Sequence, residues 1–69
     1  MVEFKLENDD FIELNKLLKI MQMAGSGGEA NQMILAGLVK ANGMVATQKR
    51  KKLRKGDVVQ VQAQEIKIV

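Results

Sequence analysis

The first residues alternate between apolar and polar side chains. Val2, Phe4 and Leu6 alternate with Glu3 and Lys5, a period-two pattern typical of a strand with one buried face. The sequence therefore predicts a short β-strand at the start of the chain.

Apolar residues then recur at helical spacing. The pattern is carried by Phe11, Leu14, Leu17, Leu18 and Met21. Asp10 and Glu13 stand three residues apart, as in a capping box, and Lys16 and Lys19 suit the C-terminal half of a helix dipole. These features predict a first helix from about Phe11 to Met23.

A glycine-rich segment from Gly25 to Glu29 follows, and it has two interpretations. A phosphate cradle of the P-loop type lacks its Lys-Ser/Thr pair here, and no hydrophobic strand leads into it. Ser26 and Glu29 instead have capping-box spacing, which predicts the start of a second helix. Ala30 and Ile34 share one face of this helix with Met33, and Gly37 offers the left-handed residue that ends it.

Short strands complete the predicted fold. The pair Asn42-Gly43 lies between two apolar runs and predicts a type I′ hairpin turn. Lys55-Gly56-Asp57 predicts another turn, and alternation from Val59 to Ile68 predicts two further strands. The order predicts a single α+β domain over residues 1–69, with two helices packed on a small antiparallel sheet.

Composition excludes several kinds of site. The 69 residues contain no Cys and no His, so thiolate and imidazole ligands and the usual general bases are missing. No catalytic nucleophile–base arrangement is evident, and we expect neither enzymatic activity nor a cofactor, metal or small-molecule substrate. No apolar stretch approaches the roughly 20 residues that span a bilayer, and the N-terminus does not resemble a signal peptide. A cytoplasmic monomer without a membrane partner is expected.

Charge is strongly segregated along the chain. Six of the eleven Lys and Arg residues lie between Thr47 and Lys55, whereas acidic residues gather between Glu3 and Glu13. Such a cluster predicts binding to a polyanion, although like-charge runs also serve as solvated surface. It is expected to continue the second strand of the hairpin or to leave it as a loop. Aromatic residues make up 3% of the chain, which disfavours recognition by base stacking.

Several spaced motifs resemble a known family. Ser26-x-x-x-Ala30, Ile34-x-x-Gly37-x-Val39, Asn42-Gly43 and Gly56-Asp57 occur in this order. The set resembles the RNA-binding domain named after the fourth protein of the small ribosomal subunit, the S4 domain, with its αL motif. The similarity covers roughly Phe11 to Val59, and the whole chain looks like the free-standing bacterial members of the YaaA and YbcJ type.

The resemblance implies a module that binds structured RNA through its helices and hairpin. By position, the RNA-contacting residues would be Lys16, Ser26, Gly27, Gly28, Asn31, Gln32, Lys40, Asn42 and Gly43. The basic run would extend this surface through Lys49, Arg50, Lys51, Lys52, Arg54 and Lys55. The chain departs from the family where many members carry Arg at Gly27 and a cation at Asn31, and where Glu13-Leu14-Asn15 replaces Arg-Leu-Asp.

Two functions therefore remain for the basic run. The first is non-catalytic binding of structured ribosomal or transfer RNA, in ribosome assembly or translation, through phosphate contacts and shape. The second is an adaptor that docks on an acidic protein partner or on a ribosomal particle. Salt-sensitive binding to RNA would support the first function, and salt-resistant binding to protein alone would support the second.

Overall fold

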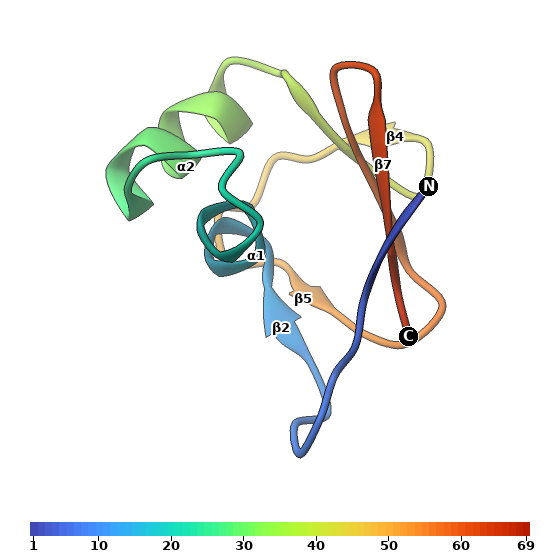
Figure 1. The fold of residues 1–69 in the computed structure, drawn as a ribbon. Helices are drawn as coiled ribbons and strands as arrows, with labels where there is room; N and C mark the ends of the chain where they lie inside the picture. Colours follow the sequence, from blue (N-terminus) through green and yellow to red (C-terminus); the bar gives the residue numbers. More distant parts are fainter.

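Two helices cover one side of a β-sheet, and this arrangement confirms the predicted α+β class (Figure 1). The computed structural model describes residues 1–69. Its elements are β1 (Val2–Phe4), β2 (Ile12–Glu13), α1 (Leu14–Ile20), α2 (Gly27–Leu35), β3 (Val39–Ala41), β4 (Met44–Val45), β5 (Lys52–Leu53), β6 (Val58–Val61) and β7 (Gln64–Ile68). Neither helix has both the length and the apolar character needed to cross a membrane.

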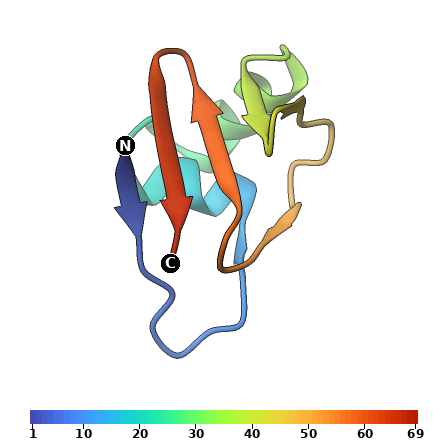
Figure 2. The same cartoon turned by 90° about the vertical axis from the view of Figure 1, so that its right-hand side faces the viewer.

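The main sheet is mixed, whereas the sequence predicted an antiparallel one. Its five strands follow the order β1-β7-β6-β3-β4, and all neighbours are antiparallel except β1 and β7. Val2 lies opposite Ile66 and Phe4 opposite Ile68 in this parallel pair. Figure 2 shows the first and the last strand side by side and running in the same direction. Almost the whole chain separates the two strands, so no tight turn imposes an antiparallel direction on them.

The first helix starts later than predicted. Ile12 and Glu13 form β2, which pairs with Leu53 and Lys52 of β5 in a separate two-stranded sheet. Glu13 is the N-cap, but its extended backbone carries no side-chain capping bond. The proposed Asp10–Glu13 capping box is therefore wrong, because the first amides of α1 find partners in a segment distant in sequence. The helix ends at Ile20, before the predicted Met23.

The second helix begins as predicted. The Ser26 hydroxyl accepts a hydrogen bond from the Glu29 N–H at 3.2 Å. The Glu29 carboxylate accepts one from the Gly25 N–H at 3.2 Å, so the reciprocal bond reaches the residue before the cap. One of the open amides at the helix N-terminus, that of Glu29, is thereby satisfied, and so is the amide of Gly25 just before the cap.

Gly37 ends the second helix as predicted. It has a φ of 79°, and its N–H donates to the Ile34 carbonyl at 3.1 Å. The Leu38 N–H donates to the Met33 carbonyl, also at 3.1 Å, which completes a Schellman motif. The chain then turns directly into β3.

The hairpin at Asn42-Gly43 is also confirmed. These residues have φ values of 53° and 84°, as a type I′ turn requires, and they connect β3 to β4. A second two-residue turn connects β6 to β7, with Gln62 at a φ of 55°. Its Gln-Ala composition carries no strong turn signal, so the sequence did not predict its conformation.

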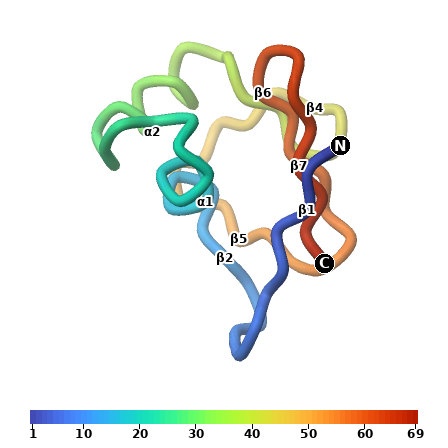
Figure 3. The backbone as a smooth tube through the Cα atoms, viewed as in Figure 1, coloured from blue at the N-terminus to red at the C-terminus, as the bar shows by residue number.

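A single apolar cluster fills the space between the helices and the sheets. It contains 15 buried residues, among them Leu14, Leu17 and Leu18 of α1 and Ala30 and Ile34 of α2. Figure 3 shows both helices on the same side of β6 and β7. Because α1 packs against α2 and its leucines belong to the common core, its position sets the position of the residues around its N-terminus.

Candidate nucleic-acid interface

The basic segment, which we define as Lys49–Lys55, is anchored to the start of α1 through its main chain. The Leu14 N–H donates to the Lys51 carbonyl at 2.9 Å, and the Asn15 N–H donates to the Lys49 carbonyl at 3.0 Å. These bonds satisfy two of the amides that a helix N-terminus leaves open. They hold the backbone in place while the side chains of Lys49 and Arg50 stay exposed.

The segment therefore has two parts. Up to Lys51 it is a loop, as one of the two predictions had it, and Lys52 and Leu53 then form β5. Leu53 is fully buried, so its exposed neighbours Lys52 and Arg54 point to the opposite side of the chain. One apolar residue in the run thus fixes the sides to which its neighbours can point.

A small polar depression lies where this segment meets the two helices. Its volume is about 290 Å³, and its lining is Glu13, Asn15, Lys16, Lys19, Gly27 and Arg50, hereafter the cationic groove. Three cations and one carboxylate surround it, so the local charge is positive. Lys16 and Gly27 were assigned to RNA binding from the family resemblance, and Arg50 from the charge pattern alone. All three line the same groove.

An amide pair links the two helices beside the cationic groove. Asn15 Nδ2 donates to Asn31 Oδ1 at 3.1 Å. Both side chains are half-buried. Asn31, predicted to contact RNA, therefore also has a structural role, and it fixes the spacing between α1 and α2. Gln32, the next residue, is exposed.

At the start of α2, the glycines Gly27 and Gly28 leave the main chain uncovered by side chains. The Ser26 hydroxyl is engaged in capping, whereas a Cβ added at Gly27 would meet nothing within 4 Å. A Cβ added at Gly28 would lie 3.9 Å from Ser26 Oγ. The position where many family members carry Arg is thus open space, and Lys19 and Arg50 line the same groove.

The hairpin turn lies at the other end of the predicted surface. Lys51 and Asn42 line a second depression of about 290 Å³, together with Met44 and residues 45–48. Lys40 is exposed on β3, and Gly43 is exposed in the turn. None of these residues lines the cationic groove, so they form a separate part of the candidate surface.

Two cations of the basic segment contact an aromatic ring. Lys52 Nζ lies 4.9 Å, and Arg54 Cζ 5.7 Å, from the centre of the Phe11 ring. Such cation–π contacts stabilise exposed sites by about 0.5–1 kcal/mol each. Sequence analysis assigned Phe11 to the helix and missed this contact, because it depends on the pairing of β2 with β5.

Sequence analysis also missed three residues of the cationic groove: Glu13, Asn15 and Lys19. A signal for Lys19 was available, since it follows Lys16 by three residues and lies on the same helix face. No comparable signal existed for Glu13, whose place follows from its pairing with Lys52.

Sequence comparison identifies the class. The family described as the S4 domain matches residues 4–69, so the chain belongs to the S4 domain family. This confirms the resemblance drawn from the ordered motifs and extends it over nearly the whole chain.

Particular relatives match over nearly their whole length. YbcJ of Escherichia coli (strain K12) is 35% identical over 69 residues, which are 100% of this chain and 99% of YbcJ. YbcJ of Shigella flexneri matches with the same identity and coverage. None of these relatives carries an enzyme name.

The fold is also similar to a solved structure. The solution structure of E. coli YbcJ superimposes with a TM-score of 0.74, covering 100% of this chain and 87% of that one. That structure is described as revealing an ALFAL motif involved in RNA binding.

Proposed function

We propose that this protein binds structured RNA, ribosomal or transfer RNA, without catalysing a reaction. Lys16 and Arg50 would neutralise phosphates at the cationic groove, and Lys49 would do so beside it. The main-chain amides at the start of α2 would face the same RNA strand. Lys51, Gln32 and Lys40 would extend the contact toward the hairpin. Binding of this kind suits a role in ribosome assembly or translation.

One observation carries the proposal. Lys16 and Gly27, which the family resemblance marks, line the same groove as Arg50, which the charge pattern marks independently. The main-chain bonds from Asn15 and Leu14 hold the basic segment there without using its side chains. A fixed backbone with free cations favours phosphate contacts, because the main chain loses little conformational entropy when RNA binds.

Structured RNA is favoured over unpaired strands. Binders of single strands stack bases on aromatic rings, and this chain has only Phe4 and Phe11. Phe4 packs against the apolar core, and Lys52 and Arg54 lie over Phe11. Recognition by shape and phosphate therefore fits the surface better than base stacking.

The test compares two variants with equal loss of charge. Lys49→Gln/Arg50→Gln removes one cation that lines the cationic groove and the exposed cation next to it, and Lys5→Gln/Lys67→Gln removes two exposed cations elsewhere. Binding to a folded ribosomal RNA fragment and to a transfer RNA would be measured by filter retention at several salt concentrations. We expect the groove variant to lose about tenfold in affinity, and the control to lose much less.

Equal losses of RNA affinity for the two variants would contradict the proposed site. The binding would then be a non-specific attraction between the net positive charge and RNA. Binding to protein that resists salt, with no binding to either RNA, would favour the adaptor function instead. If the groove variant alone loses affinity, ultraviolet cross-linking of the wild-type protein in the native cells, followed by sequencing of the bound RNA, would identify the RNA.

A further inference from the structure

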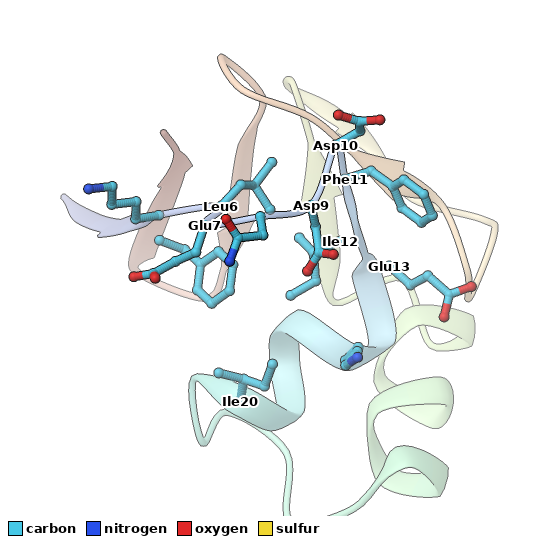
Figure 4. Close-up of a pocket in the computed structure, with 12 residues that line it drawn as sticks. Leu6, Glu7, Asp9, Asp10, Phe11, Ile12, Glu13 and Ile20 are labelled. Atoms are coloured by element: carbon cyan, nitrogen blue, oxygen red, sulfur yellow. The ribbon is translucent and has the colours of Figure 1, made fainter.

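A larger groove lies between the N-terminal loop and α1 (Figure 4). Its volume is about 680 Å³, and its walls include Phe4, Ile12 and Ile20 on the apolar side and Glu7 and Asp9 on the polar side. We call it the N-terminal groove. It shares Glu13 and Lys16 with the cationic groove, so the two depressions adjoin.

The N-terminal groove presents an apolar surface to solvent. Ile20 is 49% exposed at the end of α1, and Phe4 is half-buried on β1. Ile12, only 7% exposed, lies between the loop and α1 in Figure 4. Covering such side chains would stabilise a complex by about 25 cal/mol for each Å² removed from water.

The main chain directly after β1 has an open edge at Lys5, which lines the groove. The Phe4 carbonyl accepts from the Val69 N–H at 2.8 Å, and the Leu6 N–H donates to the Val69 carbonyl at 2.9 Å. Because successive residues of an extended chain point to opposite edges, the N–H and C=O of Lys5 face away from β7. No main-chain bond outside the helices and strands uses Lys5, and β1 is the outer strand of the sheet.

The polar wall is acidic although the chain carries a net charge of +3. In Figure 4, Asp9 points from the loop toward α1, whereas Asp10 and Phe11 point away from it. Glu7, Asp10 and Glu13 also line the groove, against two lysines. No group of three acidic side chains is placed to hold a metal ion. An occupant with positive charge is favoured, and an RNA strand is repelled.

We propose that the N-terminal groove binds an extended, Lys- or Arg-rich segment of a partner protein. The segment would add to the open edge of β1, a known mode of peptide recognition in which main-chain bonds provide affinity. Its aliphatic side chains would cover Phe4 and Ile20, and its cations would lie beside Glu7 and Asp9. The contact would leave the cationic groove free.

A second copy of this chain fits the groove less well than another protein. Its only cation-rich stretch is the basic segment, and Lys49 and Lys51 are already bonded through their carbonyls to α1. That stretch would have to leave the fold to become a strand elsewhere. The inference does not depend on RNA binding, because Glu7, Asp9 and Ile20 lie outside the cationic groove.

The probe is a labelled peptide, acetyl-Lys-Val-Lys-Ile-Lys-Val-Lys-amide, with the same peptide carrying Glu in place of Lys as a control. Binding would be measured by fluorescence anisotropy and by amide chemical-shift changes in the labelled protein. We expect shifts over residues 4–13 and at Ile20, and no binding of the acidic peptide. Glu7→Gln/Asp9→Asn should weaken the complex by about five- to tenfold.

Matched variants separate the proposal from general attraction. Ile20→Gln should weaken peptide binding, whereas Leu38→Gln, at a site that is 50% exposed, should not. Lys49→Gln/Arg50→Gln should weaken RNA binding and leave peptide binding unchanged, so the failure of one function does not imply the failure of the other. Shifts confined to other surfaces, or self-association that produces the same shifts without peptide, would overturn the inference.

Discussion

Asn42 and Asp57, which are 15 residues apart, are joined through their side chains: Asn42 Nδ2 donates to Asp57 Oδ1 at 3.1 Å. Asn42 Oδ1 accepts from the Val58 N–H at 2.9 Å, and Asp57 Oδ2 accepts from the Arg54 N–H at 2.8 Å. The hairpin turn is thereby tied to the end of the basic segment. The Asn-Gly and Gly-Asp motifs therefore have a structural explanation beside any RNA contact.

Asn42→Gly should lower the free energy of unfolding by about 1–2 kcal/mol. Glycine adopts the positive φ of 53° readily, so the loss reports the two side-chain hydrogen bonds rather than strain. Urea denaturation would measure it. Gln62→Gly is the control, since Gln62 has a φ of 55° in an exposed turn; equal losses for both variants would show that the Asn42 bonds contribute nothing.

Local motifs made most of the fold predictable. Ser26, Gly37 and Asn42-Gly43 act through bonds and dihedral angles within a few residues, and each does so in the structure. The start of α1 was not predictable in this way. Its first amides bond to carbonyls of Lys51 and Lys49, and the pairing of Ile12 with Leu53 has no local signature.

The sequence predicted which basic residues belong to the candidate site, but not how they are arranged in space. The charge pattern marked the whole basic run, but the structure separates Arg50, in the cationic groove, from Lys52 and Arg54, over Phe11. That separation follows from the burial of Leu53 and from the strand pairing beside it. Both are tertiary effects that composition does not encode.

Ser26→Ala should lower the free energy of unfolding by about 1 kcal/mol, because the Glu29 N–H loses its capping partner. Urea denaturation would measure the change, with Thr47→Ala as the control, since Thr47 is an exposed hydroxyl residue outside any helix. An unchanged stability would mean that water replaces the cap at no cost.

The salt dependence of RNA binding should distinguish the two parts of the basic segment. If about five phosphates are contacted, log affinity should fall with log salt at a slope of about −3.5 to −4.5. Lys49→Gln/Arg50→Gln should reduce the slope by about 1.5, since each lost phosphate contact removes about 0.7–0.9. Titrations at five salt concentrations would measure it.

Lys52→Gln/Arg54→Gln provides the comparison for that titration, because it removes the same charge. Both side chains lie over Phe11, and we expect a smaller change in slope together with a loss of stability of about 1 kcal/mol. A slope change as large as that of the groove variant would show that RNA extends over Phe11.

Gly27→Arg should strengthen RNA binding by a few-fold, since it adds a cation to a groove already lined by Lys16, Lys19 and Arg50. The Cβ meets nothing within 4 Å, so the side chain has room. Arg favours a helix over Gly by about 0.8 kcal/mol, which offsets the unfavourable 0.3–1 kcal/mol of a cation near the N-terminus. Stability should therefore change little.

Gly28→Arg is the matched control for Gly27→Arg, because it adds the same cation one position along α2, outside the lining of the groove. Filter binding and urea denaturation would be measured on both variants. Tighter binding for Gly27→Arg alone would place RNA phosphate at the cationic groove. Weaker binding for Gly27→Arg would instead indicate that RNA approaches the main chain at Gly27, because the added side chain would obstruct that contact. The glycine at this position would then serve the close approach of RNA.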